Sequence, residues 1–470
     1  MKKVLFKILS ISILFCTITS AQNTKEKIRE ILSQLPESSE YSVMIYNPLE
    51  DEIIYEHNIE KPMIPASNTK LFTTVAALEY LGPDAKVYTR LLTDALEWEG
   101  STLDGNIYIK GFGDPTFSYS RLDSMVKSLA DSGLKVINGG VFADDSYFDD
   151  IYTRDDWIID EKANVNLPPV SALVIDRNEL NVRASTSGKA GNSLEIDIRN
   201  KFDFCKIINS AKITSYRKAP RFDLSIDDGK IELVVKGGLR KRKYPLYYSI
   251  FVESPRLWAA SILKNTLEKH GITVNGKAAE GVVAIPAIEM ASSHISLLDL
   301  LKVINKNSDN FKAEALFKLV GAYYSNKQGN SFYATQAILT LIDEMGIFEA
   351  GTEVVDGSGI SRFNFVTTRA VVELLSNVYF DENLYEVYKH TLSVSGRDGT
   401  LEKRIRTGGM RGKFFGKTGT LRGVTALSGY LDTKNGNELI VSIILQYDKK
   451  GGRFHKNIED EIIEVLYKNE

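Results

Sequence analysis

Cysteine is nearly absent from this chain, with two in 470 residues. Two thiols cannot build a disulfide scaffold or a four-thiolate zinc site. An excess of one charge is also lacking, because 58 Lys and Arg face 61 Asp and Glu and leave a formal charge of −3. This balance gives no electrostatic reason to expect nucleic acid as a partner. Hydrophobic residues (43%) and charged residues (25%) occur at ordinary globular levels, which excludes a disordered, collagenous, coiled-coil or polytopic membrane chain.

No long hydrophobic run is found at the N-terminus. The apolar stretch Ile8–Ile18 is shorter than the roughly 20 residues that a membrane-spanning helix needs. Lysines precede or enter this stretch, and the small residues Thr19-Ser20-Ala21 follow it. The pattern predicts a secretory signal peptide over residues 1–21, and therefore an exported protein, periplasmic or extracellular. A buried N-terminal helix is the alternative. Removal of the signal peptide leaves Cys205 as the only thiol, so hydrophobic cores must hold the domains together.

Hydrophobic patterning divides the rest of the chain into three parts. Residues 22–84 show a helix, two strands around a turn and a second helix over 71–81. Residues 85–250 consist of short β-rich runs separated by Gly, Asp and Ser, which predicts one or two inserted β-rich modules. Residues 251–470 return to helices and end with a β-hairpin and a closing helix. We therefore predict that the first and last parts share one α+β domain.

The first of three chemically informative motifs opens the helix over 71–81. Ser67 and Lys70 are three residues apart, so their side chains share one helical face. A serine hydroxyl becomes nucleophilic when a base accepts its proton, and burial can lower the pKa of a lysine enough for it to be that base. Backbone N–H groups at a helix N-terminus could hold an oxyanion. An isolated match also fits a helix-capping serine beside an exposed lysine.

The second motif is Ser308-Asp309-Asn310, directly before a helical pattern. The Ser308 hydroxyl could pass a proton between the base and a leaving group, and the Asn310 amide could hold a substrate carbonyl. All three residue types also favour a helix N-cap, which is the alternative interpretation.

The third motif, Lys417-Thr418-Gly419-Thr420, precedes the strands of the final hairpin. A lysine beside two hydroxyls suits a terminal carboxylate. Gly419 permits a substrate to approach the backbone closely, and the Thr420 N–H could complete an oxyanion hole.

Together and in this order, the three motifs resemble those of the penicillin-recognising serine acyltransferases. The long separation between Ser67 and Ser308 is similar to the branch of D-alanyl-D-alanine carboxypeptidases/endopeptidases called class C low-molecular-mass penicillin-binding proteins (peptidase S13, penicillin-binding protein 4 type). Serine β-lactamases have far less sequence at this point. Further segments similar to that branch extend the resemblance over nearly the whole mature chain: Gly111–Thr116, Val170–Leu173, Asp356–Arg362 and Gly396–Leu401.

The resemblance implies a β-lactamase/transpeptidase-like catalytic domain, an antiparallel sheet flanked by helices, formed by residues 22–84 and 251–470. It implies peptidoglycan stem peptides as substrates, cleaved at D-alanyl-D-alanine ends or D-alanyl cross-links, and β-lactam antibiotics as covalent inhibitors. No metal or organic cofactor is implied, because nucleophile, base and oxyanion donors all lie in the chain. The implied catalytic residues are Ser67 (acylated), Lys70 (general base) and Ser308 (proton relay), and the implied substrate-binding residues are Asn310, Lys417, Thr418, Gly419 and Thr420.

The same resemblance implies two further substrate contacts, and the chemistry of an arginine side chain suggests a third. Asp144 and Phe148 match, by local pattern, an inserted aspartate and an aromatic that help to recognise the charged side chain of the peptide. They lie in or beside the acid-rich stretch 144–162, which also fits solvated loops, whereas a calcium site lacks EF-hand spacing. Arg362 could pair with a side-chain carboxylate, or it could be an ordinary loop arginine.

Two rival functions stay open from the sequence. A serine β-lactamase needs fast deacylation, and we find no motif for a dedicated deacylating glutamate. A catalytically silent wall-binding protein would keep the same fold. The five histidines lack the spacing of a zinc protease or a histidine-based triad. The basic run Arg240–Lys243 allows contact with anionic lipid or wall polymer, although exposed loop charges are commoner. We expect at most peripheral membrane contact.

Overall fold

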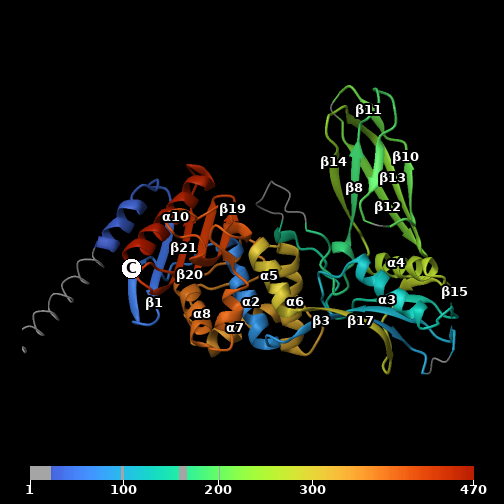
Figure 1. The fold of residues 1–470 in the computed structure, drawn as a ribbon, viewed down its shortest axis with the longest axis horizontal. Helices are drawn as coiled ribbons and strands as arrows, with labels where there is room; N and C mark the ends of the chain where they lie inside the picture. The colour runs from blue at the N-terminus through green and yellow to red at the C-terminus, as the bar shows by residue number, and fades with distance from the viewer. Residues whose placement is uncertain (1–22, 97–99, 158–166, 201, 217) are drawn as a thin grey trace, which may run out of the picture.

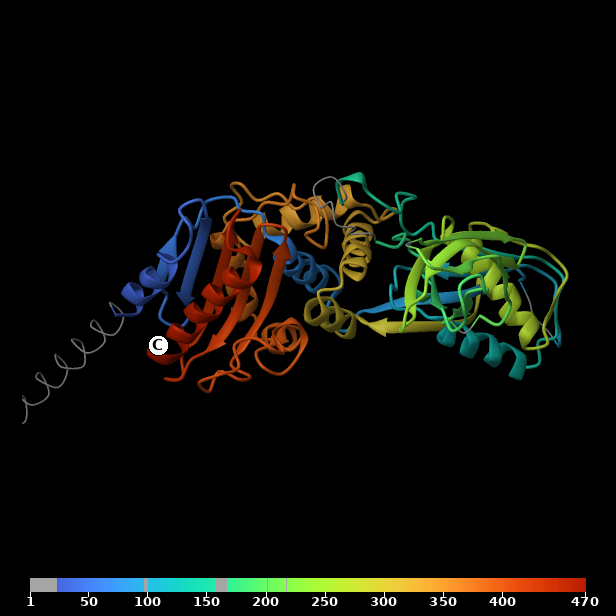
Figure 2. The ribbon, with the colours of Figure 1, turned by 90° about the horizontal axis from the view of Figure 1, so that it is seen from above.

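The structure is a computed structural model that describes residues 23–96, 100–157, 167–200, 202–216 and 218–470 (Figure 1). The signal peptide expected over residues 1–21 lies outside the described residues, as does part of the acid-rich stretch. Within the described ranges, we find no helix with the length and apolar character required to cross a bilayer. The chain forms two lobes (Figures 1 and 2), and the second carries a module that projects away from the body of the molecule (Figure 1).

A six-stranded antiparallel sheet joins the two ends of the chain in the first lobe. Its order is β18-β19-β20-β21-β1-β2. The N-terminal strand β1 pairs with the C-terminal strand β21, with Tyr41 opposite Leu445, so the first and last parts of the chain share one domain. The strand bounds, in sheet order, are β18 (Ser393–Val394), β19 (Phe414–Leu421), β20 (Val424–Asp432), β21 (Glu438–Gln446), β1 (Glu40–Asn47) and β2 (Glu52–His57).

Helices cover both faces of this sheet, since β20 and β21 are buried along almost their whole length. The C-terminal helix α10 and a helix over residues 23–32 pack on one face. The helices α2 and α8 pack on the other face, and α5 and α6 lie between the sheet and the second lobe (Figure 1). The remaining elements of this lobe are η1 (Ala66–Asn68), α2 (Thr69–Leu81), α5 (Leu297–Asn307), α6 (Asn310–Ser325), α7 (Ser331–Glu344), α8 (Thr368–Phe380), α9 (Tyr385–Lys389), η4 (Gly399–Leu401) and α10 (Gly451–Asn469). The predicted α+β class is confirmed.

The second lobe is inserted between α2 and α5. Its five-stranded sheet has the order β16-β7-β5-β3-β17. Because β3 pairs antiparallel with β17, the chain leaves the first lobe and returns to it at the same place. This pairing carries the inserted part to Ser296, whereas we expected it to end near residue 250. The elements are β3 (Lys86–Thr93), β4 (Thr102–Leu103), β5 (Ile107–Gly111), α3 (Tyr119–Asp131), β6 (Val136–Ile137), β7 (Val141–Asp144), η2 (Asp155–Trp157), η3 (Asp176–Asn178), α4 (Pro255–Lys269), β15 (Thr273–Val274), β16 (Ala278–Glu280) and β17 (Ile288–Ser296).

The projecting module consists of two small sheets that rise from α3 and α4 (Figure 1). Alternate residues of β13, including Ile231, Leu233 and Val235, are buried, as expected for strands with one face in a core. The strands of the module are β8 (Glu179–Ser185), β9 (Glu195–Ile198), β10 (Cys205–Asn209), β11 (Lys212–Thr214), β12 (Pro220–Asp227), β13 (Lys230–Arg240) and β14 (Leu246–Phe251).

Candidate active site

Ser67 lies in the short 3₁₀-helix η1, which runs directly into α2. Two hydrogen bonds fix this turn: Thr69 Oγ1 donates to the Ala66 carbonyl at 2.9 Å, and Asn68 Nδ2 donates to Ser428 Oγ on β20 at 2.8 Å. Ala66 has a φ of 48°, an uncommon conformation for a residue with a side chain. The sheet and the helix therefore hold a strained turn that presents a half-buried Ser67.

Lys70, in the first turn of α2, is completely buried. Its Nζ lies 3.0 Å from Ser67 Oγ, 2.6 Å from Asn310 Oδ1 and 2.5 Å from the Ser358 carbonyl oxygen. Burial lowers the pKa of Lys70 to about 8, although the nearby carboxyls of Asp356 and Glu314 oppose this shift. About a tenth of the amine is therefore unprotonated at pH 7, next to the Ser67 hydroxyl, whereas an ordinary lysine would have well under a hundredth.

The second motif forms the junction between α5 and α6. Ser308 adopts a left-handed conformation (φ 54°) at the end of α5, and Asp309 caps α6 by accepting a hydrogen bond from the Lys312 N–H. The same carboxylate contacts Arg177 Nη1 at 2.8 Å and Lys312 Nζ at 2.6 Å. Although burial opposes them, these two cations lower the pKa of Asp309, so the carboxylate stays ionised. The ion pairs fix the loop that carries Ser308 and Asn310.

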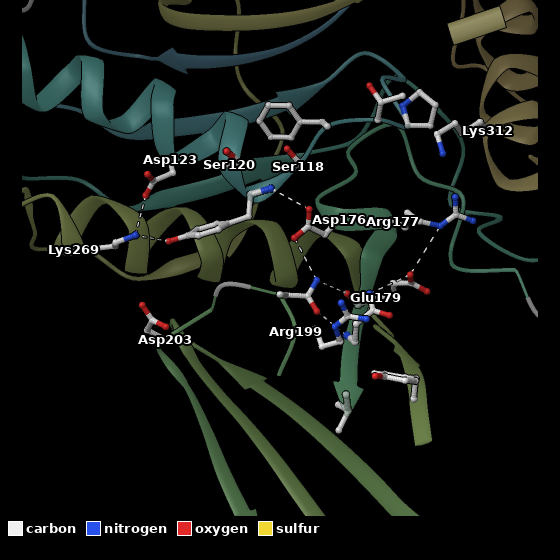
Figure 3. Close-up of a pocket in the computed structure, with 18 residues that line it drawn as sticks. Ser118, Ser120, Asp123, Asp176, Arg177, Glu179, Arg199, Asp203, Lys269 and Lys312 are labelled. Atoms are coloured by element: carbon white, nitrogen blue, oxygen red, sulfur yellow. Dashed lines mark hydrogen bonds and ion pairs between the residues drawn. The ribbon is translucent and has the colours of Figure 1, made fainter. Parts of the chain in front are cut away.

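Arg177 and Lys312 also line a cavity of about 850 Å³ at the junction between the two lobes (Figure 3). Most charged groups in it are already paired. Lys269 contacts Asp123 at 3.1 Å, and Asp176 accepts a hydrogen bond from the Tyr119 N–H. Ser67, Lys70 and Lys417 are not among its lining residues. The wall of this cavity therefore contributes Arg177 and Lys312 to the candidate active site, where they hold the Asp309 carboxylate.

The third motif lies on β19, a strand that contacts η1. Lys417 is completely buried, and its Nζ donates to Ser308 Oγ and to the Thr418 carbonyl, both at 2.9 Å. Burial, together with the charge of Lys70, holds the pKa of Lys417 well below its usual value. The Thr418 hydroxyl is held by the Thr400 hydroxyl of η4 at 2.8 Å. Lys70 of the first motif thus contacts Ser67, and Lys417 of the third motif contacts Ser308. The two lysines are near enough for the charge of Lys70 to lower the pKa of Lys417.

Two glycines allow the backbones around Ser67 to approach one another. A Cβ on Gly419 would lie 2.7 Å from the Pro65 carbonyl oxygen, so β19 can pass along η1 because this residue has no side chain. Gly359 has a φ of 77°, and its Cβ would lie 1.9 Å from the Ala66 carbonyl oxygen. Any larger residue at either position would push the nucleophile turn away from its neighbours.

The loop 356–361 supports the lysine of the first motif, and two buried carboxyls hold it. Glu314 on α6 accepts hydrogen bonds from the backbone N–H groups of Gly357 at 3.3 Å and Ser358 at 2.8 Å. Asp356 accepts hydrogen bonds from the backbone of Gly359 and Ser361 at 2.7 and 2.8 Å. Burial raises the pKa of both carboxyls, and repulsion between them raises that of Glu314 further. The loop therefore presents the Ser358 carbonyl rigidly to the lysine amine.

We had assigned no role to Glu314, Asp356 or Thr400 from the sequence. The resemblance covered the segments around Asp356 and Thr400, but only the tertiary structure shows what these side chains touch. One sequence feature could have indicated that Glu314 is buried: it is a lone acidic residue within the apolar stretch 313–317 of a predicted helix.

The structure brings together Ser67, Lys70, Ser308, Asn310 and Lys417, which we call the Ser67 cluster. Thr418 and Gly419 lie beside this cluster on β19. Thr420 follows at the exposed end of the motif, where its hydroxyl bonds to the Gly419 carbonyl.

Asp144, Phe148 and Arg362 lie elsewhere or at the margin. Asp144 is fully buried and paired with Lys110 at 2.8 Å, and Phe148 is fully buried in the core. Across the described ranges, no hydrogen bond or ion pair joins either side chain to the Ser67 cluster. As substrate contacts they stay predictions, and each would need its surroundings to move before it reached a ligand. Arg362 is partly exposed and donates to the Arg422 carbonyl at 2.5 Å, just beyond the end of β19.

Residues 24–468 match the family described as the D-Ala-D-Ala carboxypeptidase 3 (S13) family. The chain belongs to this family. It is 29% identical over 418 residues to a D-alanyl-D-alanine carboxypeptidase of Actinomadura sp. (strain R39), covering 86% of this chain and 77% of the relative. It is 28% identical over 426 residues to the D-alanyl-D-alanine carboxypeptidase DacB of Haemophilus influenzae, covering 88% and 86%.

Solved structures agree with this membership. The crystal structure of penicillin binding protein 4 (dacB) from Haemophilus influenzae is similar to this S13 chain with a TM-score of 0.81 and 26% identity, over 94% of this chain and 99% of that one. The same protein complexed with a β-lactam gives a TM-score of 0.75. The resemblance to the S13 peptidases is thus confirmed, and the chain is an enzyme of a D-alanyl-D-alanine carboxypeptidase (hydrolase) family.

Proposed function

We propose that this S13 peptidase is exported and removes the terminal D-alanine from peptidoglycan stem peptides through an acyl-enzyme on Ser67. The observation that carries the proposal is the 3.0 Å contact between Ser67 Oγ and the Nζ of a completely buried lysine, Lys70. Family membership supports the substrate class, and the signal-peptide pattern at residues 1–21 supports export.

The acylation step uses the residues around this contact. The unprotonated Lys70 amine takes the proton of Ser67, whose Oγ forms a bond to the carbonyl carbon of the penultimate D-alanine. The backbone N–H groups of Ser67 and Thr420 stabilise the oxyanion that develops. The C–N bond then breaks, and the proton that Lys70 took from Ser67 passes through Ser308, which contacts Lys417 Nζ, to the leaving nitrogen. Lys70 is thereby unprotonated again.

Substrate binding is assigned to the β19 side of the cluster. The terminal carboxylate pairs with Lys417 and the Thr418 hydroxyl, and the Asn310 amide contacts the peptide before the cleaved bond. The negative charge of the carboxylate favours the protonated form of Lys417, whose pKa is otherwise lowered by burial. Water then attacks the acyl-enzyme and gives one proton to Lys70, and Lys70 passes this proton to Ser67 Oγ as the bond to the shortened peptide breaks. A D-alanyl cross-link fits the same chemistry, with a side-chain amine as the leaving group.

Penicillins fit the same site as substrate mimics. Attack by Ser67 opens the lactam ring, and the leaving nitrogen stays covalently attached to the acyl group, so it continues to block the path of water. The β-lactam complex of the Haemophilus influenzae protein supports this part of the proposal.

Labelling with a fluorescent penicillin tests the proposal. The native protein and a Ser124→Ala control, changed at an exposed serine on α3, should retain a stable label, and Ser67→Ala should not be labelled. The native protein should also release D-alanine from a peptide ending in D-Ala-D-Ala, and mass analysis of a cross-linked dimer would show whether it cuts cross-links. Absence of label on the native protein would refute the acyl-enzyme. Rapid drug hydrolysis without persistent label would identify a β-lactamase instead.

A further inference from the structure

The far end of the projecting module is formed by three segments that come together in space. Strand β13 begins beside α4, where the Gly229 N–H donates to Ser261 Oγ at 3.3 Å, and it runs away from the body to Arg240. At that end Arg240 pairs with Thr214 of β11, and Thr186 Oγ1 donates to the Arg242 carbonyl at 3.0 Å. We call residues 186–193, 210–219 without residue 217, and 238–245 the basic tip; it lies around the label β11 in Figure 1.

The basic tip has an extreme charge composition. It contains no Asp or Glu, and without its cations the formal charge of the chain would be −10 instead of −3. Its seven basic residues are Lys189, Lys212, Lys218, Arg240, Lys241, Arg242 and Lys243. An overall acidic protein therefore concentrates positive charge at the point farthest along its projecting module.

The cations of the tip are free to meet a partner. All seven are exposed. None of these exposed cations forms an ion pair with a carboxylate in the part of the chain that the structure describes; Lys212 donates to the Ser193 hydroxyl at 3.1 Å. Two large aromatic side chains stand among them, Tyr216 at 62% exposure and Tyr244 at 66%. A tyrosine with an apolar ring and a polar hydroxyl is well suited to the boundary between water and lipid.

We propose that the basic tip docks the enzyme on an anionic lipid surface, with its lysines and arginines at the headgroup phosphates and Tyr216 and Tyr244 at the interface. The interaction goes beyond the proposed function and does not depend on it. It would be reversible and peripheral, since it rests on charge and two tyrosines.

The shape of the tip favours a surface over a threaded polymer. The charges lie in loops and at the adjoining strand ends of the β-module, and those in the described residues are all exposed. An exposed cluster at a free end can meet many headgroups of a flat membrane at once, whereas a single polymer chain is better held in a groove. Because the module stands away from α2 and β19 (Figure 1), docking through its tip would leave the active site open.

Vesicle flotation tests the proposal with the native protein. Vesicles of phosphatidylcholine with about one third phosphatidylglycerol should carry the protein at about 0.05 M salt and release it at about 0.5 M. Vesicles of phosphatidylcholine alone should not carry it. Each lysine or arginine at an anionic surface contributes roughly fivefold to binding. Changing Arg240, Lys241, Arg242 and Lys243 together to Gln should therefore weaken binding by at least about a hundredfold.

A matched variant separates the tip from general charge. Lys135, Lys277, Lys403 and Lys434 are exposed and lie outside the tip, and changing all four to Gln should leave flotation nearly unchanged. Tyr216→Ser with Tyr244→Ser should weaken binding to the anionic vesicles at low salt. Penicillin labelling of every variant reports that it is folded. The proposal is overturned if the native protein does not float with anionic vesicles, if both quadruple variants float equally, or if the tip binds purified wall polymer and not lipid.

Discussion

Acylation of Ser67 should accelerate as the pH rises through about 8, the value to which burial lowers the pKa of Lys70. The unprotonated amine accepts the proton, and for this pKa its fraction rises from about 0.09 at pH 7 to about 0.91 at pH 9. The rate constant should therefore increase about tenfold over this range and then level off. A lysine with the usual pKa of about 10.4 would instead give a nearly hundredfold increase with no levelling at pH 9.

An uncharged sulfonyl fluoride directed at serine is the best reagent for this measurement. A penicillin carries a carboxylate and would also report the protonation of Lys417, whose pKa is lowered as well. Second-order rate constants between about pH 6 and about pH 10 would give the midpoint. Lys135→Gln, at an exposed lysine far along the chain from the site, should leave the profile unchanged. A flat profile, or a steep one that does not level off, would refute the role of the buried amine as base.

Three further predictions follow from the packing around the site. Gly359→Ala should slow penicillin labelling by about a hundredfold because its Cβ would collide with the nucleophile turn. The control Gly346→Ala, at a similar positive φ with open space around it, should be labelled at the native rate. Equal labelling of the two variants would contradict the clash. Glu314→Gln removes a carboxylate that raises the pKa of the catalytic lysine, Lys70. The pH at the midpoint of the acylation profile should therefore fall below that of the native protein. The control Glu459→Gln, at another buried carboxyl, should leave this midpoint unchanged. Phe317→Ala, at a fully buried ring beneath the loop 356–361, should lower the free energy of unfolding in urea by about 3–5 kcal/mol, and a loss under about 1 kcal/mol would argue against its packing role.

Local patterns predicted the elements of the first lobe well. The strands over 41–47 and 52–57 and the final hairpin carry strong period-two or turn signals, and they coincide with β1, β2, β20 and β21. The helix α3 was missed, although Leu122, Met125, Val126 and Leu129 have helical spacing, because its segment lies among short β-rich runs. The inserted part extends beyond the expected residue 250 because α4 packs on β7 and β16, and because β17 pairs with β3; no local pattern displays these long-range contacts.

The candidate site could be predicted from the sequence only in part. Ser67 and Lys70 are close in the chain, so helical geometry alone predicts their contact. The contact between Lys417 and Ser308 joins segments far apart in the sequence, and residue patterns without the family resemblance would not have paired them. The roles of Glu314 and Asp356 depend on backbone N–H groups of a loop, which no sequence pattern displays. The burial of Asp144 also depends on the tertiary structure, because β5 and β7 pair and place its carboxylate against Lys110.

Peptide mapping by mass spectrometry of penicillin-treated protein tests the central claim most directly. The account predicts one added penicilloyl mass, located on the peptide that contains Ser67 and absent from Lys70→Ala protein treated for the same time. Modification of a different residue, or an unmodified Ser67 peptide in active protein, would contradict it.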